Sequence, residues 1–208
     1  MQKFEDNRMP KLIEEELPKS LIHSGALKFG MFTLAGGKLS PYYLDLRILP
    51  SFPDAFHASI ELLGKTAKTV EGIAKIAGIP TGGLPWASVL AYNLSKPLVY
   101  VRKEVKSHGR EKMVEGLLTP GDKVLLVDDV ITTGKNILDA SQTLRAEGGV
   151  VEDALVLVDR EEGGHEHLLK AGVKLHSVTR ISQLAQRLLD MDAINESQYE
   201  ELTTQLQK

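Results

Sequence analysis

The sequence predicts an α/β domain whose central, mostly parallel sheet is covered by helices on both faces. Short apolar stretches alternate with helical stretches through the middle of the chain. The two most apolar stretches, 124–127 and 154–158, have no polar residue on either face. Such strands are typical of a parallel sheet buried between helical layers. With 42% hydrophobic and 25% charged residues among 208, the composition is that of a globular protein.

The core elements follow one another in strand–helix order. Apolar stretches predict the strands, and apolar residues at helical spacing predict the helices between them. The expected strands are 72–78, 98–101, 124–127, 154–158 and 174–178. The expected helices begin at Pro85, Lys135 and near Glu166, and the Gly148-Gly149 pair ends the second of them.

The N-terminal region differs from this pattern. The first 25 residues predict helix interrupted at Pro18, with Gly25 as a stop. Residues 32–34 and 42–46 then predict two short strands around a Gly36-Gly37 turn. We expect these segments to form a small hood beside the α/β core.

The C-terminal region predicts two further helices. Asn195 is the expected N-cap of the last one, and Gln198 stands three residues on, as in a capping box. We therefore expect a single domain over 1–208. Its parts would be N-terminal helices and hood (1–50), α/β core (51–180) and C-terminal helices (181–208).

Composition excludes several classes of function. Lys and Arg number 25 against 28 Asp and Glu, a net charge of −3, which argues against binding nucleic acid through bulk charge. There is no cysteine, so disulfides, thiolate metal sites and cysteine nucleophiles are excluded. No apolar run approaches the roughly 20 residues of a membrane span. The polar first residues do not form a signal peptide. We expect a cytoplasmic protein with no membrane or nucleic-acid partner.

The most informative stretch begins at the 124–127 strand, which ends in Asp128 and Asp129. Two apolar residues, Thr132, Thr133, Gly134 and a helix follow. The helix N-terminus, the hydroxyls and the flexible glycine suit a phosphate beyond the carboxyl end of the strand. Two adjacent carboxylates would repel a phosphate, so they must face a neutral group such as a ribose. The stretch predicts a ribose 5-phosphate site. Its glycines fit neither a dinucleotide fingerprint nor a Walker A loop.

This string resembles the phosphoribosyl pyrophosphate motif of type I phosphoribosyltransferases. Two further stretches are similar to the orotate phosphoribosyltransferase family. Residues 102–109 (RKEVKSHG) resemble its mobile catalytic loop, and 29–34 with 40–43 resemble its hood. Residues 158–164 also resemble the family. The C-terminal third looks closest to the transferase part of bifunctional UMP synthase, whose decarboxylase we expect to lie elsewhere.

The resemblance implies the type I phosphoribosyltransferase fold and an enzyme of UMP biosynthesis. Its reaction would transfer ribose 5-phosphate from phosphoribosyl pyrophosphate to orotate, giving orotidine 5′-monophosphate and pyrophosphate. The implied cofactor is Mg²⁺, held mainly by substrate and water, so no metal-ligating side chain is expected. A homodimer with shared active sites is also implied.

The resemblance further implies a role for each matching residue. Those reaching the pyrophosphate are Arg102, Lys103, Lys106 and His108, which with the ribose-holding Asp128 and Asp129 form the implied catalytic set. The 5-phosphate cradle is Val130, Ile131, Thr132, Thr133, Gly134, Lys135 and Asn136. Backbone N–H groups of Thr81 and Gly82 would bind pyrophosphate. The orotate site is Thr132, Arg160, Tyr43 and Leu44, with Arg160 pairing with the orotate carboxylate.

Two positions depart from the family pattern. Bacterial members carry lysine where this chain has Ala35 and Gly82. Lys38 is the candidate replacement for the first lysine. These changes bear on the pyrophosphate side of the site.

Other interpretations remain open. A purine or uracil phosphoribosyltransferase would share the phosphate motif, but those bases have no carboxylate for Arg160. A nucleotide-sensing regulator or a bare sugar-phosphate-binding module would share the fold without needing the 102–109 loop. Arg160 could instead form an ion pair with Glu161 or Glu162. His165 and His167 are expected to be surface histidines, because side chains two apart on a helix point in different directions.

Overall fold

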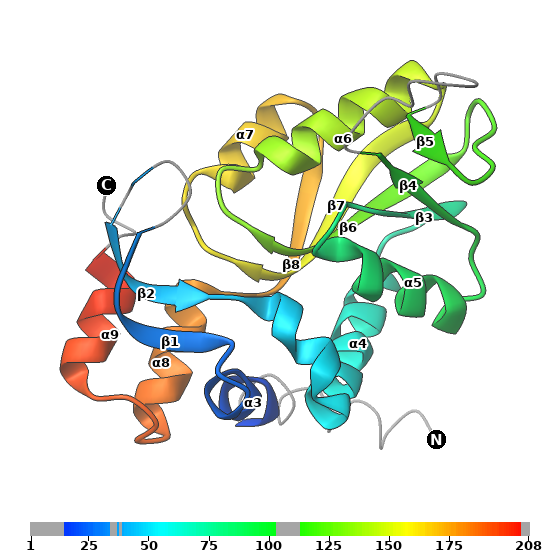
Figure 1. Ribbon diagram of the computed structural model, residues 1–208. Coiled ribbons are helices and arrows are strands. Elements are labelled where there is room, and N and C mark those ends of the chain that lie inside the picture. The colour runs from blue at the N-terminus through cyan, green and yellow to red at the C-terminus, as the bar shows by residue number, and fades with distance from the viewer. Residues whose placement is uncertain (1–14, 34–36, 38, 103–112, 205–208) are drawn as a thin grey trace.

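The computed structural model of the chain (Figure 1) describes residues 15–33, 37, 39–102 and 113–204. Its centre is a six-stranded sheet in the order β5-β4-β3-β6-β7-β8. All neighbouring strands are parallel except the β4–β5 pair at one edge. The strands are β3 (Lys75–Gly78), β4 (Leu98–Val101), β5 (Val114–Glu115), β6 (Lys123–Ile131), β7 (Val150–Asp159) and β8 (Lys174–Arg180). The predicted parallel α/β architecture is therefore confirmed.

Helices cover both faces of the sheet, and the central strands alternate between two hydrophobic clusters. Leu125 and Leu155 belong to the cluster with α4 (Pro53–Ala67), α5 (Gly83–Asn93) and α8 (Ile181–Asp190). Leu126 and Val156 belong to the cluster with α6 (Lys135–Ala146) and α7 (Gly164–Lys170). Because successive side chains of a strand point to opposite faces, both sets must be apolar. This explains the unbroken apolar runs in the sequence.

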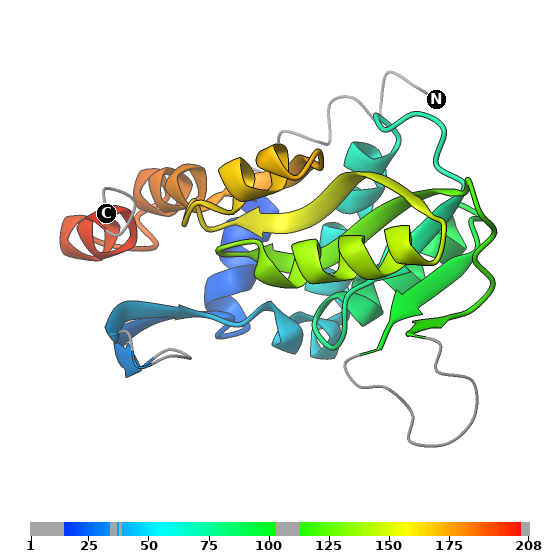
Figure 2. The same cartoon turned by 90° about the horizontal axis from the view of Figure 1, so that it is seen from above.

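A hairpin of β1 (Leu27–Thr33) and β2 (Leu39–Leu44) forms the hood. It lies with α3 (Leu17–His23), α8 and α9 (Glu196–Thr203) at the end of the sheet toward which β6 and β7 run (Figures 1 and 2). The buried hood residues Leu27, Tyr42 and Leu44 belong to the same hydrophobic cluster as α4 and α5. The hood is thus packed onto the core at the edge where parallel α/β sheets bind ligands.

Several boundaries differ from the sequence prediction. The acid pair, Asp128 and Asp129, lies inside β6 and not after its end, because β6 continues to Ile131 in register with β7. The first core strand begins at Lys75, three residues after the predicted start.

At the hood, the second strand ends at Leu44 and not at Leu46. A 3₁₀ helix (Leu46–Ser51) begins there because the Asp45 carboxylate accepts a hydrogen bond from the backbone N–H of Arg47. The first hood strand is longer than predicted, and neither α4 nor β5 was predicted. The predicted capping box is confirmed, since Asn195 and Gln198 exchange side chain–backbone hydrogen bonds.

Candidate active site

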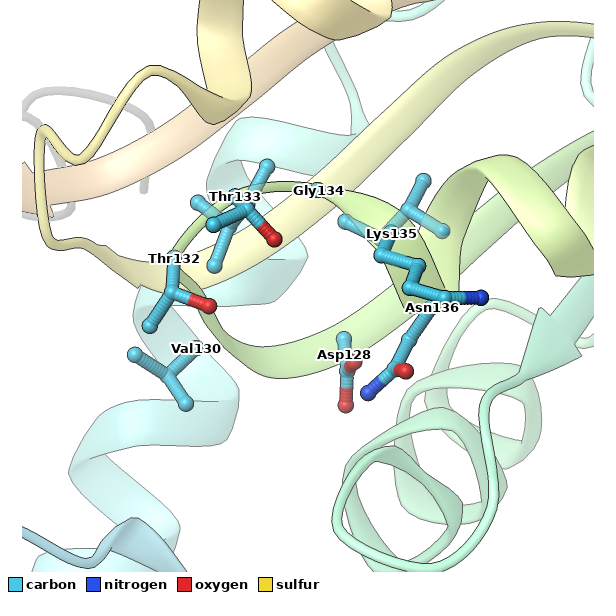
Figure 3. Close-up of a pocket in the computed structure, with 9 residues that line it drawn as sticks. Asp128, Val130, Thr132, Thr133, Gly134, Lys135 and Asn136 are labelled. Atoms are coloured by element: carbon cyan, nitrogen blue, oxygen red, sulfur yellow. The ribbon is translucent and has the colours of Figure 1, made fainter. Parts of the chain in front are cut away.

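The phosphate loop, residues 132–134, joins β6 to α6 and borders a pocket of about 60 Å³ (Figure 3). Gly134 is the N-cap of α6 and adopts a left-handed conformation with φ of 80°, which favours glycine. No side chain caps the helix, so N–H groups of its first turn remain available to a ligand. The pocket lining is Asp128 together with every residue from 130 to 137. The residues predicted to form the 5-phosphate cradle therefore lie together around one pocket.

The side chains of Asn136 and Lys135, two residues of the predicted cradle, lie differently relative to the pocket (Figure 3). Asn136 and Asp128 both line the pocket, whereas the Lys135 side chain extends along α6. The Lys135 Nζ forms an exposed ion pair with Asp139 at 2.6 Å. In this arrangement Lys135 contributes its backbone to the pocket, and its ammonium group lies against its own helix.

The acid pair is buried beside this loop. Asp128 and Asp129 are 7% and 6% exposed, and neither forms an ion pair within the part of the chain that the structure describes. The charge of Arg47, which pairs with Asp45, acts on Asp129 at longer range. Burial, reinforced by the charge of Asp129, raises the pKa of Asp128 well above its usual range. Burial also raises the pKa of Asp129. Two adjacent buried carboxyls without a directly paired cation are costly, so their local environment suits a ligand that supplies hydroxyl donors or positive charge.

The loop between β3 and α5 packs directly onto the acid pair. An ideal Cβ at Gly82 would lie 2.8 Å from both carboxylate oxygens of Asp129. One at Gly83 would lie 2.9 Å from Asp128 Oδ1. The structure thus brings the predicted pyrophosphate loop, Thr81 and Gly82, to the acids. In this structure, any side chain at Gly82 would have to displace the Asp129 carboxylate.

Arg102 stands at the end of β4, where its backbone N–H donates to the Met113 carbonyl at 2.8 Å. Its guanidinium forms an ion pair with Glu115 at 3.2 Å. The other predicted pyrophosphate residues, Lys103, Lys106 and His108, lie outside the described residues, as do Ala35 and Lys38.

Arg160 follows β7 and is held in place at both its backbone and its side chain. Its backbone N–H donates to the Ile131 carbonyl at 3.0 Å. Its Nη2 donates to the Tyr42 hydroxyl at 3.1 Å, and its guanidinium carbon lies 4.9 Å from the centre of the Tyr42 ring. Burial raises the pKa of Tyr42, which keeps the phenol neutral beside the cation.

Arg160 also forms the ion pair with Glu162 that the alternative interpretation predicts, at 2.8 Å between Nη2 and Oε1. Its Nε is nevertheless buried without a hydrogen-bond acceptor among the described residues. A buried guanidinium N–H without a partner is costly and suits an incoming acceptor.

The structure places the two predicted hood residues of the orotate site in different surroundings. Tyr43 and Leu44 are neighbours on a strand and so point to opposite faces. Leu44 is buried in the hydrophobic cluster of the hood and core, while Tyr43 packs on Phe32 and its hydroxyl accepts from Arg47. Tyr42, one residue earlier, is the hood residue that contacts Arg160. Strand alternation could have separated Tyr43 from Tyr42 and Leu44, which share the buried face of β2.

His165 and His167 are exposed, as predicted. His167 additionally contacts the phosphate loop, with its Nδ1 2.9 Å from the Thr133 carbonyl oxygen. The described residues contain no group of three or more His, Cys, Asp or Glu placed to hold a metal ion. Nor do they contain a helix long and apolar enough to cross a membrane.

Comparison with known proteins agrees with this geometry. The phosphoribosyl transferase domain family matches residues 52–175. An orotate phosphoribosyltransferase of Sulfolobus acidocaldarius is 44% identical over 182 residues, covering 86% of this chain and 90% of that protein.

Two solved structures are also similar. The orotate phosphoribosyltransferase of Aeropyrum pernix has 39% identity and a TM-score of 0.72, covering 83% of this chain and 98% of that chain. Leishmania donovani UMP synthase has 33% identity and a TM-score of 0.84, covering 92% of this chain and 42% of that chain. The chain therefore belongs to the phosphoribosyltransferase family. Within that family, its similarity to these relatives assigns it to the orotate phosphoribosyltransferases.

Proposed function

We propose that this chain transfers ribose 5-phosphate from phosphoribosyl pyrophosphate to orotate, releasing pyrophosphate and forming orotidine 5′-monophosphate. One observation carries the proposal. The buried Asp128–Asp129 pair lies between the phosphate loop and the Gly82-Gly83 loop, while Arg160 is hydrogen-bonded to the last residue of the same strand. Each part of the two substrates thus has a chemically matched neighbour at one edge of the sheet.

The phosphate loop would hold the 5-phosphate. N–H groups at the start of α6 and the hydroxyls of Thr132 and Thr133 are donors, and the positive end of the helix dipole favours an anion. Asp128 and Asp129 would accept hydrogen bonds from the ribose 2- and 3-hydroxyls. As the bond at C1 breaks, positive charge develops on the ring, and the field of the two carboxylates stabilises it.

The leaving pyrophosphate would lie over the Thr81-Gly82 backbone. The resemblance to the family adds Arg102, Lys103, Lys106 and His108 as the cationic groups that neutralise it. The absence of side-chain bulk at Gly82 lets backbone N–H groups approach an anion directly. In this arrangement the backbone takes the place that a lysine occupies in bacterial members.

Magnesium is part of the proposal. The buried carboxyls of Asp128 and Asp129, whose pKa values are raised by burial, fit a cation bound nearby. Bound Mg²⁺ would neutralise pyrophosphate charge while keeping several water ligands. The residues nearest to it would be the acid pair, which holds the ribose end of the donor.

Arg160 would bind the orotate carboxylate. Its Nε lacks an acceptor among the described residues, and a planar guanidinium binds a carboxylate through two N–H groups. The carboxylate would join or replace Glu162 at this guanidinium. This position favours orotate over a purine or uracil, which have no carboxylate to offer.

The test is pyrophosphate release with phosphoribosyl pyrophosphate and Mg²⁺, offering orotate, uracil, adenine and hypoxanthine separately. We expect release with orotate only. Release with another base would retain the phosphate site and overturn the orotate assignment. No release with any base, while the sugar donor still binds, would favour the nucleotide-sensing regulator.

We also propose that the enzyme is a homodimer with active sites shared between subunits. The support is the family resemblance of residues 102–109, together with the prior that most soluble oligomers are two-fold dimers.

A further inference from the structure

The phosphate loop is packed against the start of α7, the helix that follows the Arg160 segment. A glycine stands on each side of this contact. A Cβ at Gly164 would overlap the Thr132 carbonyl oxygen and lie 2.7 Å from the Ile131 side chain. A Cβ at Gly134 would lie 3.3 Å from the Gly164 carbonyl oxygen. The two backbones therefore lie close enough for a side chain on α7 to reach the loop.

His167 makes that contact. Its Nδ1 lies 2.9 Å from the Thr133 carbonyl oxygen, which can only accept a hydrogen bond. The Nδ1 must therefore carry the proton, as it does both in the corresponding neutral tautomer and in the imidazolium. Because both forms donate, the contact does not require a charged histidine.

The Thr133 carbonyl belongs to the same peptide group as the Gly134 N–H. In a trans peptide these two bonds point in opposite directions. Gly134 lines the phosphate pocket, and its N–H has no acceptor within the part of the chain that the structure describes. A donor that holds the carbonyl on the α7 side therefore turns the N–H toward the opposite side. The hydrogen bond to the carbonyl also polarises the peptide, which strengthens the N–H as a donor.

We propose that His167 is a positioning residue for the phosphate loop: its Nδ1–H holds the Thr133 carbonyl and thereby aims the Gly134 N–H at the 5-phosphate. The inference rests on the proposed function, which places a phosphate in this pocket. His167 itself contacts no substrate in this account. It acts through one peptide group.

The experiment is a calorimetric titration of the full chain with ribose 5-phosphate. His167→Ala removes the donor, and we expect about five-fold weaker binding, the effect of losing one ordinary hydrogen bond. His167→Asn keeps an amide N–H at the same distance from the backbone as Nδ1, and we expect binding close to wild type. The matched control is His165→Ala, which removes an exposed histidine from the same helix and should not change the affinity.

Steady-state kinetics supply a second readout. We expect His167→Ala to raise the KM for phosphoribosyl pyrophosphate and to leave the KM for orotate unchanged. Suppose that the wild-type chain releases pyrophosphate with orotate, but His167→Ala binds ribose 5-phosphate as tightly as wild type. That result would overturn the role of His167 and leave the proposed function standing. If His167→Ala and His167→Asn weakened ribose 5-phosphate binding equally, the role of His167 would also be overturned. The bulk of the imidazole, and not its N–H donor, would then be what matters.

Failure of the proposed function gives a different result. A wild-type chain that binds ribose 5-phosphate but releases no pyrophosphate with orotate would contradict the function, and the three variants would still test His167. A wild-type chain that does not bind ribose 5-phosphate would overturn both proposals.

Discussion

At the residue scale, the acid pair is expected to favour catalysis and to lower the stability of the fold. Burial raises the pKa values of Asp128 and Asp129, and the charge of Arg47 only partly offsets this for Asp129, as expected of side chains retained for a ligand. If the carboxylates hold the ribose and stabilise its developing charge, Asp129→Asn should lower kcat/KM by about 100-fold. The measurement is pyrophosphate release under initial-rate conditions. Activity within two-fold of wild type would contradict the role of Asp129.

The stability effect of Asp128 has the opposite sign. Burial, followed by the charge of Asp129, raises the pKa of Asp128 in the folded state above its ordinary value of 3.8. The folded state then binds more protons than the unfolded state between these two values, so stability falls as pH rises through that window. Asp128→Asn removes this loss of stability, because an amide cannot ionise. We expect a higher Tm than wild type at pH 8 without ligand, and a smaller difference as pH falls toward 4; about 1 kcal/mol corresponds to roughly 2–4 °C at this chain length.

Asp153→Asn is the matched control, because it should act in the opposite direction. Burial opposes it, but hydrogen bonds from His176 and Lys123 hold the pKa of Asp153 below its ordinary value. Ionised Asp153 therefore adds to the free energy of unfolding at a pH above the pKa that it has in the unfolded chain. This contribution is lost as the pH falls through the pKa that Asp153 has in the folded state. We expect Asp153→Asn to lower the Tm at pH 8. If both variants shift the Tm in the same direction, the electrostatic explanation fails.

Tyr42 provides the residue-scale test of the orotate site. Its hydroxyl is the acceptor that orients Arg160 from the hood. We expect Tyr42→Phe to raise the KM for orotate about five-fold, through loss of one hydrogen bond, and to leave the KM for phosphoribosyl pyrophosphate unchanged. Tyr43→Phe is the control, since that hydroxyl accepts a hydrogen bond from Arg47, in the 3₁₀ helix that follows the hood, and not from Arg160. An orotate KM that responds to Tyr43 and not to Tyr42 would contradict the assignment.

At the element scale, the β3–α5 loop has no room for a side chain at Gly82. Gly82→Ala would place a methyl group 2.8 Å from the Asp129 carboxylate oxygens. We expect a loss of kcat/KM of at least ten-fold, because displacement of a positioned group by about 1 Å costs that much or more. Gly64→Ala is the control: it lies within α4, its Cβ would approach no closer than 3.9 Å to Leu90, and it should stabilise the helix by roughly 0.5–1 kcal/mol. Full activity in Gly82→Ala would show that the loop tolerates displacement.

Also at the element scale, the sequence predicted an element well where the residues of that element alone determine it. The unbroken apolar runs of β6 and β7 and the capping box at Asn195 were sufficient, because each is determined by local residues. Strand ends were less predictable. Polar Asp128 and Asp129 looked like residues beyond a strand, but pairing with β7 keeps the strand extended through them. β5 is only two residues long and depends on pairing with β4, so local pattern could not reveal it.

In the site, too, the features that depend on neighbouring residues in the sequence were predictable, and those that depend on packing between elements were not. The phosphate loop was predictable because its residues are contiguous. The Tyr42–Arg160 contact joins residues 118 positions apart, and the His167–Thr133 contact joins residues 34 apart. Such pairs follow from the packing of elements, which the sequence pattern of either element does not specify.

At the scale of the whole molecule, the proposed sharing of active sites predicts complementation. A mixed dimer of Lys106→Ala and Asp129→Asn subunits would contain one site with both changes and one with neither. Random mixing makes half of the dimers mixed, so we expect about a quarter of wild-type activity from two inactive parents. Different affinity tags on the two variants would confirm mixed dimers. If confirmed mixed dimers had no activity, the sites would not be shared.

The most direct test of the central claim is a crystal structure of the chain with orotidine 5′-monophosphate. We expect the phosphate on the 132–134 loop, the ribose hydroxyls on Asp128 and Asp129, and the orotate carboxylate within hydrogen-bond distance of Arg160. A product whose phosphate lies elsewhere, or whose carboxylate does not contact Arg160, would contradict the assignment of this edge of the sheet as the orotate-transferring site.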